Sequence, residues 1–475
     1  MSFQQFQDFL RRFCLCAVLA LCGCRSTQSS HAVTRLQAPD ADFIDPSSPQ
    51  PERTVAHAVD ATEKSDGGIA DTLERAWQRA IAHDYRLSAR IENQTAAEHD
   101  LASASAQRMP LVNTSAGYTV RDNDRAFQFT LPPMPTSTFP FQQREHANFA
   151  ARVRLPVYTS GRIGHDVEAA QAKIFANESE VESVLLNLKM KVATLYVSVL
   201  RAGQEVAVAK SHHTSLISHA VRAQKLLENG RASRNDVLAA NVAAADAQHG
   251  LIRASKVLRQ AHSAYNRQLG RPLDAAVRLT QPQSYGVKLD LKSATATAIS
   301  HRPEVERLIS QIQGLHHQAE SIRASRRPQV NLSGDYQFLE NRYQSPQGNA
   351  SVGVNLSWNV FDGGKLSHKA SSIDHQATSL SHLLDETKSL IRLEVRNAWL
   401  DIQETRRRLK STQSAIQQAG ENLRVAKKLY ENGRGTHTNV LDAQALRTKT
   451  HRNHLHAQYD VILAQLAFKR AMGTL

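Results

Sequence analysis

Cysteine is almost missing from this sequence. The 475 residues include 4 cysteines, and all of them lie within the first 24 residues. They are Cys14, Cys16, Cys22 and Cys24. A mature chain that begins at Cys24 has no pair of cysteines to oxidise, which excludes disulfides as a source of its stability. Packing, or association between copies of the chain, must supply that stability instead.

Long hydrophobic runs are missing as well. The mean hydropathy is −0.42, and beyond the N-terminus no uninterrupted apolar run approaches the roughly 18 residues of a membrane span. We therefore predict no transmembrane helix in the mature chain, so contact with a membrane would use strands or a lipid anchor. The short apolar run from Phe13 to Leu21 follows Arg11 and Arg12, and it predicts a signal peptide over residues 1–23.

The end of this signal has a second feature. The segment Leu21-Cys22-Gly23-Cys24 resembles a bacterial lipobox, in which cleavage leaves the last cysteine as the acylated first residue. We therefore predict Cys24 as a lipid attachment site, and an ordinary secretory signal with incidental cysteines is the alternative. Residues 24–70 contain prolines and serines without apolar periodicity, which is typical of a tether or a poorly ordered arm.

Acidic residues are fewer than basic ones, and the formal net charge is +14. The lysines and arginines are spread along the predicted helices, and no RNP or zinc-finger motif accompanies them, so we expect no nucleic acid as a partner. A basic exterior or pore lining that faces anionic lipids, proteins or solutes explains the charge more simply.

Signatures of catalysis are missing too. The 21 histidines include the pairs His212-His213 and His316-His317, but they have no consistent spacing to carboxylates or cysteines that would indicate a metal site. Neighbouring histidines on a helix point in different directions, so we interpret them as surface residues. No phosphate-binding loop of the Walker A type is present. The sequence predicts no catalytic, cofactor-binding or metal site.

What the sequence does contain is an internal repeat. The segment Leu226 to Leu238 returns as Leu429 to Leu441, 203 residues later, with 7 of 13 positions identical and no gap. Such a repeat indicates one structural unit used twice. Each copy predicts a helix–turn–helix tip, in which Gly230 or Gly433 supplies the left-handed residue that ends one helix and a hydroxyl residue caps the next.

The rest of the chain follows the same order of elements twice. In the first repeat, 71–272, we expect a helix, a β-hairpin at 111–158, a long helix at 162–228, a tip at 229–235 and a helix at 236–269. After a linker at 273–290, the second repeat, 291–475, has a helix, a β-hairpin at 329–361, a long helix at 365–431, a tip at 432–438 and a helix at 439–472. Each long helix would measure about 100 Å. In the second one, apolar residues step by three and four from Ile402 to Tyr430, as in a left-handed coiled coil.

In the strands, apolar residues alternate with charged or small ones, so each hairpin has one apolar face. A sandwich and a membrane barrel with a polar lumen both fit this pattern. The strands of the first hairpin are joined by a proline-rich connection, and matching positions are offset by 218 residues before the strands and by 203 after them. The first hairpin therefore has the longer loop, which we expect to face solvent.

Two hairpins leave strand edges without partners, which lipid would not tolerate, so copies must associate until the sheet closes. Three copies would give twelve strands and a barrel with a lumen. In such a barrel Val354, Leu356 and Trp358 would form part of an outward lipid-facing band, while Arg152 and Arg154 would be candidates for the lumen.

Several short motifs in fixed order point to a family. They are Thr72-Leu73-Glu74-Arg75-Ala76, the turns at Gly161 and Gly364, the tips at Gly230 and Gly433, His301-Arg302-Pro303-Glu304, and Arg470-Ala471-Met472-Gly473. Over about residues 70–475 this order resembles the TolC-type outer membrane factor family. The resemblance implies a mainly α fold with a β-barrel portion, in which duplicated coiled-coil helical hairpins and two β-hairpins per chain trimerise into a twelve-strand outer-membrane barrel and a periplasmic α-barrel.

The resemblance also implies partners and a function. A homotrimeric channel of this kind is an exit duct for tripartite efflux or type I secretion, and it contacts outer-membrane lipid. It receives cargo from an inner-membrane pump of the RND or ABC type through a periplasmic adaptor. A periplasmic coiled-coil adaptor or scaffold that forms no pore is the alternative, and an enzyme is a more distant one.

Site residues follow from the resemblance as well. The tips would contact the adaptor through Gly230, Arg231, Ser233, Gly433, Arg434 and Thr436. The periplasmic aperture would be formed by Asp236, Tyr430, Arg434, Asn439 and Asp442. Asp236 matches a family residue that ties the closed entrance to an aromatic and an arginine; Tyr430 matches the aromatic, and Arg434 would substitute for the arginine because Gly435 occupies its position.

Simpler roles stay open for these residues. Asp236 has capping-box spacing to Ser233 and would then only cap its helix. Tyr430 would be part of the coiled-coil core, and Asp442 a solvated helix charge. At the aperture ring the family pattern has acidic residues at the positions of Asn439 and Asp442, and only Asp442 keeps the carboxylate.

Overall fold

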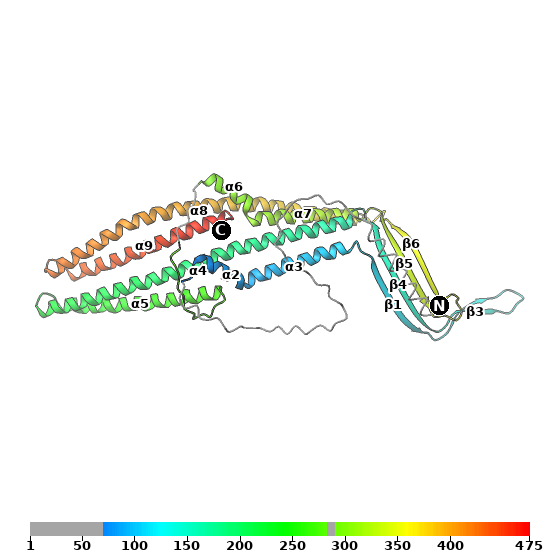
Figure 1. The fold of residues 1–475 in the computed structure, drawn as a ribbon, viewed down its shortest axis with the longest axis horizontal. Helices are drawn as coiled ribbons and strands as arrows, with labels where there is room; N and C mark the ends of the chain where they lie inside the picture. The colour runs from blue at the N-terminus through cyan, green and yellow to red at the C-terminus, as the bar shows by residue number, and fades with distance from the viewer. Residues whose placement is uncertain (1–69, 283–289) are drawn as a thin grey trace. The chain divides into compact units, whose positions relative to one another are not determined.

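The structure is a computed structural model that describes residues 70–282 and 290–475. The expected signal peptide at 1–23, the lipid attachment site Cys24 and nearly all of the tether lie outside these residues. Figure 1 shows the order of the elements. The helices are α2 (Leu73–His83), α3 (Tyr85–Ala106), α4 (Arg162–Glu228), α5 (Arg234–Gln268), α6 (Leu291–His301), α7 (Pro303–Ala324), α8 (Lys365–Glu431) and α9 (His437–Ala471). The strands are β1 (Leu111–Val120), β2 (Arg125–Phe129), β3 (Ser137–Gln142), β4 (Glu145–Tyr158), β5 (Gln329–Leu339) and β6 (Gly348–Ser357).

The repeat is exact in its helices. Both α4 and α8 have 67 residues, and both α5 and α9 have 35. Each long helix starts after a left-handed glycine, Gly161 with φ +90° and Gly364 with φ +86°, a conformation that glycine adopts without steric cost. The mainly helical fold with a strand portion, expected from the sequence, is confirmed.

The helices pack as two long hairpins. In the first hairpin α4 packs against α5, and in the second α8 packs against α9; α7 lies between α4 and α8, and α4 also contacts α9 (Figure 1). The predicted coiled-coil seam of α8 is confirmed. Its buried residues are Ile402, Thr405, Ala419, Leu423, Ala426 and Tyr430, and its half-buried ones are Leu409, Thr412 and Ile416.

The sequence predicts no transmembrane helix in the mature chain, but α4 meets the usual criteria for one. This helix contains an 18-residue window with a mean hydropathy of 1.4, so by length and composition alone it would pass for a membrane span. A third of that window is buried, at 33%, and the helix packs against α3, α5, α7 and α9. The buried third of that window therefore serves helix packing.

Four strands form one antiparallel sheet in the order β1-β4-β5-β6. The connection between β1 and β4, residues 121–144, is longer than the one between β5 and β6, residues 340–347, as the repeat offsets predict. Within that connection β2 and β3 pair as a second small sheet, which the sequence analysis did not predict. Phe127 and Phe141 stack with ring centroids 4.5 Å apart, so aromatic packing helps to hold the hairpin despite its prolines.

Candidate functional site

The strand register gathers the apolar residues of all four strands on one face. Val112 pairs with Val153, Val153 with Gly334, and Gly334 with Val352. The next row joins Leu155, Leu332 and Val354. In the single chain this face lies open, since Val352, Val354 and Leu356 are 75%, 72% and 66% exposed. Removing one such side chain from water stabilises a protein by about 1.5–3 kcal/mol, so an uncovered face of this size requires an apolar environment.

The other face of the same sheet is polar. Arg152 lies between Asn113 on β1 and Asp335 on β5, and the side chains of Arg152 and Asp335 form an ion pair. Ser351 on β6 continues this row. Arg154, the second lumen candidate, pairs with Ser333 in the same alternation. Alternation of a lipid-facing apolar side with a polar lumen is the pattern of a transmembrane barrel wall.

The dimensions of the sheet also suit a bilayer. Strands of 10 residues, such as β1 and β6, extend for about 33 Å, enough to cross the hydrocarbon core when they are tilted. At the end next to the helices, Tyr158 ends β4 and Trp358 directly follows β6, and both aromatic side chains are exposed. Among the described residues, β1 and β6 have no strand on their outer edges.

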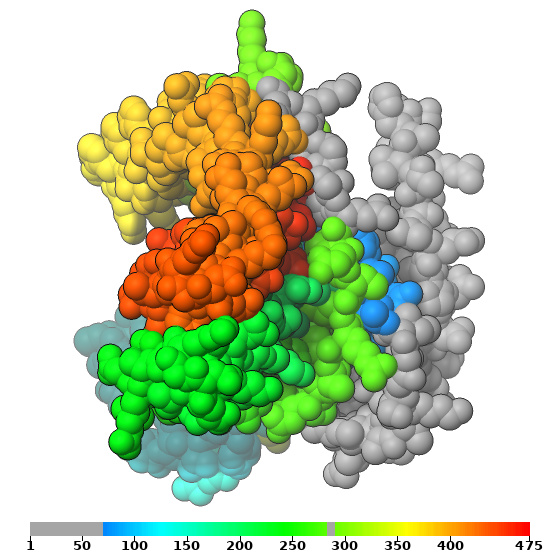
Figure 2. All heavy atoms as spheres, turned by 90° about the vertical axis from the view of Figure 1, so that its left-hand side faces the viewer, coloured from blue at the N-terminus to red at the C-terminus, as the bar shows by residue number. Residues whose placement is uncertain are grey.

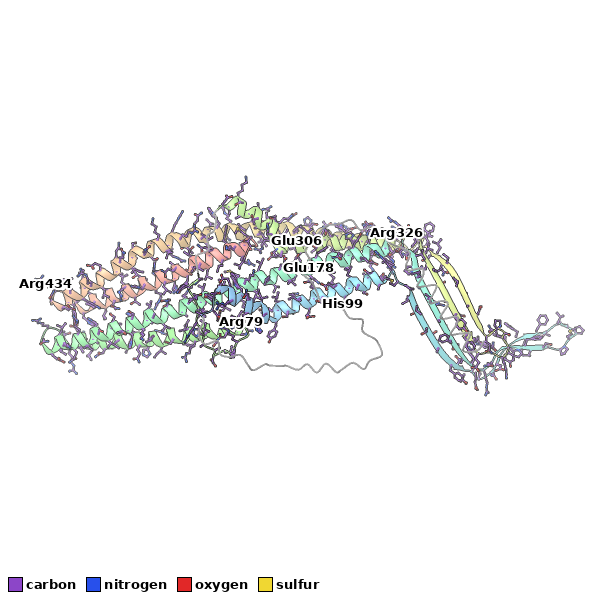
Figure 3. The ribbon with its side chains drawn as sticks, in the orientation of Figure 1. Arg79, His99, Glu178, Glu306, Arg326 and Arg434 are labelled. Atoms are coloured by element: carbon purple, nitrogen blue, oxygen red, sulfur yellow. The ribbon has the colours of Figure 1, made fainter. Side chains whose placement is uncertain are left out.

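The far ends of the two helical hairpins carry the predicted adaptor contacts. Each turn closes its helix in the same way, with the N–H of the glycine and the N–H of the following arginine bonded back to helix carbonyls. The pairs are Gly230 to Leu227 at 2.9 Å, Arg231 to Leu226 at 2.7 Å, Gly433 to Tyr430 at 3.1 Å and Arg434 to Leu429 at 2.9 Å. The six predicted contact residues, including Arg434 at the end of its hairpin in Figure 3, are all exposed.

Asp236 takes the capping role that its spacing predicts. Its carboxylate accepts the Ser233 N–H at 3.2 Å, and its own N–H donates to the Ser233 hydroxyl at 3.1 Å, a complete capping box. Thr436 caps α9 with its hydroxyl, as Ser233 caps α5, since the N–H of Asn439 donates to that hydroxyl at 3.2 Å. The structure therefore does not bring Asp236 into a hydrogen bond with Tyr430.

The other aperture residues divide into buried and exposed ones. Tyr430 is buried in a small core with Leu423, Ala426 and Val440, and its hydroxyl has no hydrogen-bond partner. Arg434, Asn439 and Asp442 are exposed near the second tip. The gate roles of Asp236, Tyr430, Arg434, Asn439 and Asp442 stay predictions.

A contact that no sequence pattern predicts joins the two hairpins near their tips. His219 of α4 lies against Tyr430 of α8 and His437 of α9, with ring centroids 5.4 Å and 4.9 Å away. The imidazole nitrogens His219 Nε2 and His437 Nδ1 are 3.0 Å apart. One turn along α4, Arg222 forms an ion pair with Glu431. Figure 2 looks onto this end and shows α8 and α9, in orange to red, directly against the green first hairpin.

Burial shapes the charges in this contact. The pKa of His219 is lowered to about 4. Burial is the largest cause, followed by the neighbouring His437, Lys427 and Arg222, and Asp236 acts in the opposite direction. Burial also lowers the pKa of His437, and burial followed by Asp236 raises the pKa of the Tyr430 phenol. The contact is therefore made of neutral rings near pH 7. No local pattern marks it, since its three rings come from three helices.

A second cluster explains two motifs of the sequence. The buried guanidinium of Arg302 forms ion pairs with Glu304 at 2.9 Å and with Glu394 at 3.0 Å, and Arg470 pairs with Glu394 from the other side. Burial alone would raise the pKa of Glu304, but the hydrogen bonds and charge of Arg302 outweigh it and hold that pKa below its usual value. The motifs at 301–304 and 470–473 therefore meet in space.

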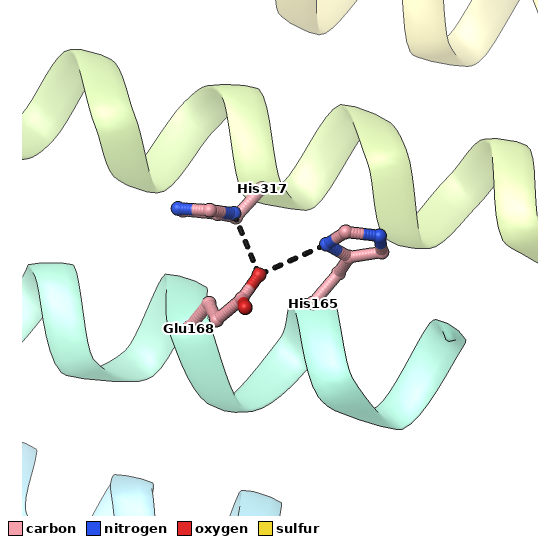
Figure 4. A group of neighbouring side chains, drawn as sticks. All are labelled: His165, Glu168 and His317. Atoms are coloured by element: carbon pink, nitrogen blue, oxygen red, sulfur yellow. Dashed lines mark hydrogen bonds and ion pairs between the residues drawn. The ribbon is translucent and has the colours of Figure 1, made fainter. Parts of the chain in front are cut away.

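A third cluster was not expected from the sequence. His165 and Glu168 on α4 and His317 on α7 could hold a metal ion, because one ligand atom from each lies within 4.8 Å of the others (Figure 4). Spacing along the sequence does not reveal this group, because 149 residues separate Glu168 from His317.

The comparisons with known proteins agree with this geometry. The model of the family described as "Outer membrane efflux protein" matches residues 76–271 and 295–474. The outer membrane protein TolC of Vibrio cholerae is 22% identical over 427 residues, which cover 86% of this chain and 91% of that protein. The alkaline protease secretion protein AprF of Pseudomonas aeruginosa is 22% identical over 322 residues, or 64% of this chain and 65% of that one.

Solved structures agree in fold. The outer membrane protein VceC of Vibrio cholerae superposes with a TM-score of 0.73 at 18% identity, covering 84% of this chain and 96% of VceC. At this level of identity the similarity concerns the fold. It extends over the strands and the helical hairpins together.

Proposed function

The chain belongs to the outer membrane efflux protein family, and we propose that three copies of it form a duct for small-molecule efflux. The duct lies in the outer membrane, and its helical part lies in the periplasm. The apolar face of the four-stranded sheet is the observation that carries the proposal. This face presents a continuous apolar surface to lipid. The opposite face presents Arg152 and Asp335 to water. A barrel wall has this arrangement, and it needs more than four strands to close.

The free strand edges and the helices support the trimer. The outer edges of β1 and β6 each require a partner strand within the bilayer, and β6 of one copy against β1 of the next supplies both. Several leucines of α8 are exposed in the single chain. They are Leu383, Leu390, Leu393 and Leu400. Contact with a neighbouring copy would cover these side chains and extend the helical hairpins into a periplasmic tunnel.

The tips supply the entrance in this proposal. The exposed turns around Gly230 and Gly433 would meet a periplasmic adaptor, and an inner-membrane pump would supply the energy. The contact of His219 with Tyr430 and His437 would hold the two hairpins together in the resting state. Opening the entrance then requires these rings to separate, while the capping box of Asp236 preserves the turn itself.

Type I secretion is the second candidate, and it is favoured by the similarity to AprF, which is named for protease secretion. The lipobox expected at Cys24 favours efflux. Isolation of the native complex from the outer membrane distinguishes the two, since efflux predicts a proton-driven pump as the co-isolated partner and secretion predicts an ATP-driven transporter. We also infer that the chain has no catalytic activity of its own, which its family and fold support.

The experiment that tests the duct combines size and conductance. Protein extracted from outer membranes should have the mass of three chains in native mass spectrometry and should form channels in planar bilayers. A monomer without conductance would favour the scaffold interpretation and would overturn the duct. Two variants test which face of the sheet meets lipid. Val354→Asp on the apolar face should impair insertion into the membrane, whereas the control Ser351→Asp on the polar face should not.

A further inference from the structure

The group of His165, Glu168 and His317 is not used by the duct or by its tip contact. His165 and Glu168 are three residues apart on α4 and therefore lie on one face of that helix. His317 faces them from α7. The Oε2 atom of Glu168 is 3.0 Å from His165 Nδ1 and 2.9 Å from His317 Nδ1, and the two imidazole rings lie nearly parallel with centroids 6.1 Å apart. Figure 4 shows both rings directed at the carboxylate.

The two helices are held at a fixed distance on both sides of this group. On one side Gly314 packs against Ala172, so closely that a Cβ added to the glycine would be in contact with the alanine methyl at 3.4 Å. On the other side the hydroxyl of Ser321 donates a hydrogen bond to the carboxylate of Asp166. The backbone positions of the three residues are therefore set by packing that does not depend on them, which is the preorganisation that a binding site needs.

The donor set has the chemistry of a transition-metal site. Two imidazoles and one carboxylate are a known ligand set for Zn²⁺, which binds nitrogen and oxygen at about 2.0–2.2 Å and accepts water at a fourth position. The ligand atoms lie within 4.8 Å of one another, and ligands of a tetrahedral ion are about 3.3 Å apart, so binding requires only small rotations that separate Glu168 Oε2 slightly from the two imidazole nitrogens. The side chain of Glu168 is 54% exposed and those of His165 and His317 are 33% and 36% exposed, so they have room to rotate and water has access.

We propose that His165, Glu168 and His317 bind a divalent transition-metal ion of the Zn²⁺ class, which joins α4 to α7 near the end of β4 and the start of β5. The position gives the ion a structural consequence. α4 follows β4 directly and α7 precedes β5, and β4 and β5 are paired neighbours in the sheet. The ion therefore links the two repeats where the strands and helices meet.

The repeat itself offers a comparison for the carboxylate. His368 occupies the position of His165 in the second repeat, 203 residues later, but Ser371 stands where Glu168 would be. α4 thus supplies both a histidine and a carboxylate, whereas α8 has only the histidine at the matching positions. Glu168→Ser would give the first repeat the residue that the second repeat has at this position.

The test uses the full protein in detergent after removal of metals with a chelator. Equilibrium dialysis against Zn²⁺ should give one tightly bound ion per chain, and Co²⁺ should give the visible absorption of a four-coordinate site. His165→Ala, His317→Ala and Glu168→Gln should each weaken this uptake at least about tenfold, since even outer-shell changes at metal sites cost about 10–100-fold. His249→Ala, at an exposed histidine of α5, should leave it unchanged.

Glu168→Gln keeps the size of the side chain, so it separates loss of a ligand from loss of the fold. Its elution in size-exclusion chromatography should match the wild type, and Zn²⁺ should raise the unfolding temperature of the wild type but not of this variant. Wild-type protein that binds no tight ion would overturn the proposal. So would equal uptake by the wild type and all three ligand variants.

Discussion

The two repeats of this chain have one backbone plan and different charges. Gly270, with φ +69°, lies against the side chain of His83, and Gly473, with φ +75°, lies against the carbonyl of His301. These glycines are 203 residues apart and close the two repeats in the same way. The residue after each histidine differs, since the first repeat has Asp84 and the second has Arg302.

The difference changes what holds each repeat together. Asp84 caps α3 by accepting the N–H groups of Arg86 and Leu87 at 2.9 and 3.0 Å, and it accepts a hydrogen bond from Gln268 at 2.8 Å. The buried Arg302 instead forms ion pairs with two half-buried glutamates. Duplication has therefore kept the glycines and caps that reverse the chain, while the charged positions have diverged into separate roles.

The largest expected effect comes from breaking the buried charge cluster of the second repeat. Arg302→Met leaves the half-buried Glu304 without its cation and Glu394 with Arg470 alone, and we expect a loss of about 3 kcal/mol in the free energy of unfolding, the low end of the range for a broken buried pair. Asp84→Ala, the matched change in the first repeat, removes a cap and should cost about 1 kcal/mol. Denaturant unfolding in detergent measures both, and equal losses would contradict the comparison.

The tip contact should depend on pH, and the sign follows from the pKa of His219. This pKa is lowered to about 4 in the folded contact, against about 6.5 for a free histidine. The contact is therefore fully stable above pH 6.5 and weakens as the pH falls toward 4, by up to roughly 3 kcal/mol. Conductance in planar bilayers should rise over that range if the contact closes the entrance.

His219→Phe tests the same point by keeping a ring without the titrating group. We expect most of the pH dependence to disappear, with a remainder from His437, whose pKa is also lowered by burial. His249→Phe on α5 provides a control, since that residue is exposed. An unchanged pH profile in His219→Phe would contradict a role of this histidine.

The tip glycines should behave alike in both repeats. Gly230 and Gly433 have φ +69° and +72°, and neither has a heavy atom within 4 Å of an added Cβ. Alanine at either position should thus cost only the backbone strain, about 1–2 kcal/mol, seen as faster hydrogen exchange at that tip. Gly420→Ala inside α8, where no positive φ is required, should instead stabilise the helix by up to about 1 kcal/mol.

The smallest effect is expected at the ion pair beside the tip contact. Arg222 and Glu431 join α4 to α8, but their side chains are 57% and 38% exposed, so the pair should contribute only about 0.2–1 kcal/mol. A double-mutant cycle with Arg222→Ala and Glu431→Ala measures it. A coupling that exceeds this range and persists in high salt would show that the charges, more than the rings, hold the hairpins together.

Local patterns predicted the parts of the fold that depend on neighbours in the sequence. The tips follow from Gly230 and Gly433, because a left-handed glycine and a hydroxyl cap end and start helices within a few residues. The face alternation of β4 and β6 follows from a period of two, and the burial of Tyr430 follows from its heptad position. The β2–β3 hairpin was not predicted, because the repeat offsets give the length of that connection and not its conformation.

The contacts between distant residues could not be read in the same way. His219 meets His437 across 218 residues, and nothing near either residue marks the other. The partner of Arg302 on α8, Glu394, lies 92 residues away. Such pairs depend on which helices lie side by side and on how far each is rotated about its axis, and the periodicity of one helix fixes neither quantity.

The duplicated frame, the lengths of the helices and the two faces of the strands follow from the order of the residues alone, because backbone geometry and side-chain periodicity are local. Which polar side chains meet depends on how the helices pack. These groups are the rings of His219, Tyr430 and His437, the ion pairs of Arg302, and the ligand set of His165, Glu168 and His317. These groups come from different helices, and packing between helices, rather than any segment of the chain, sets the distances between them.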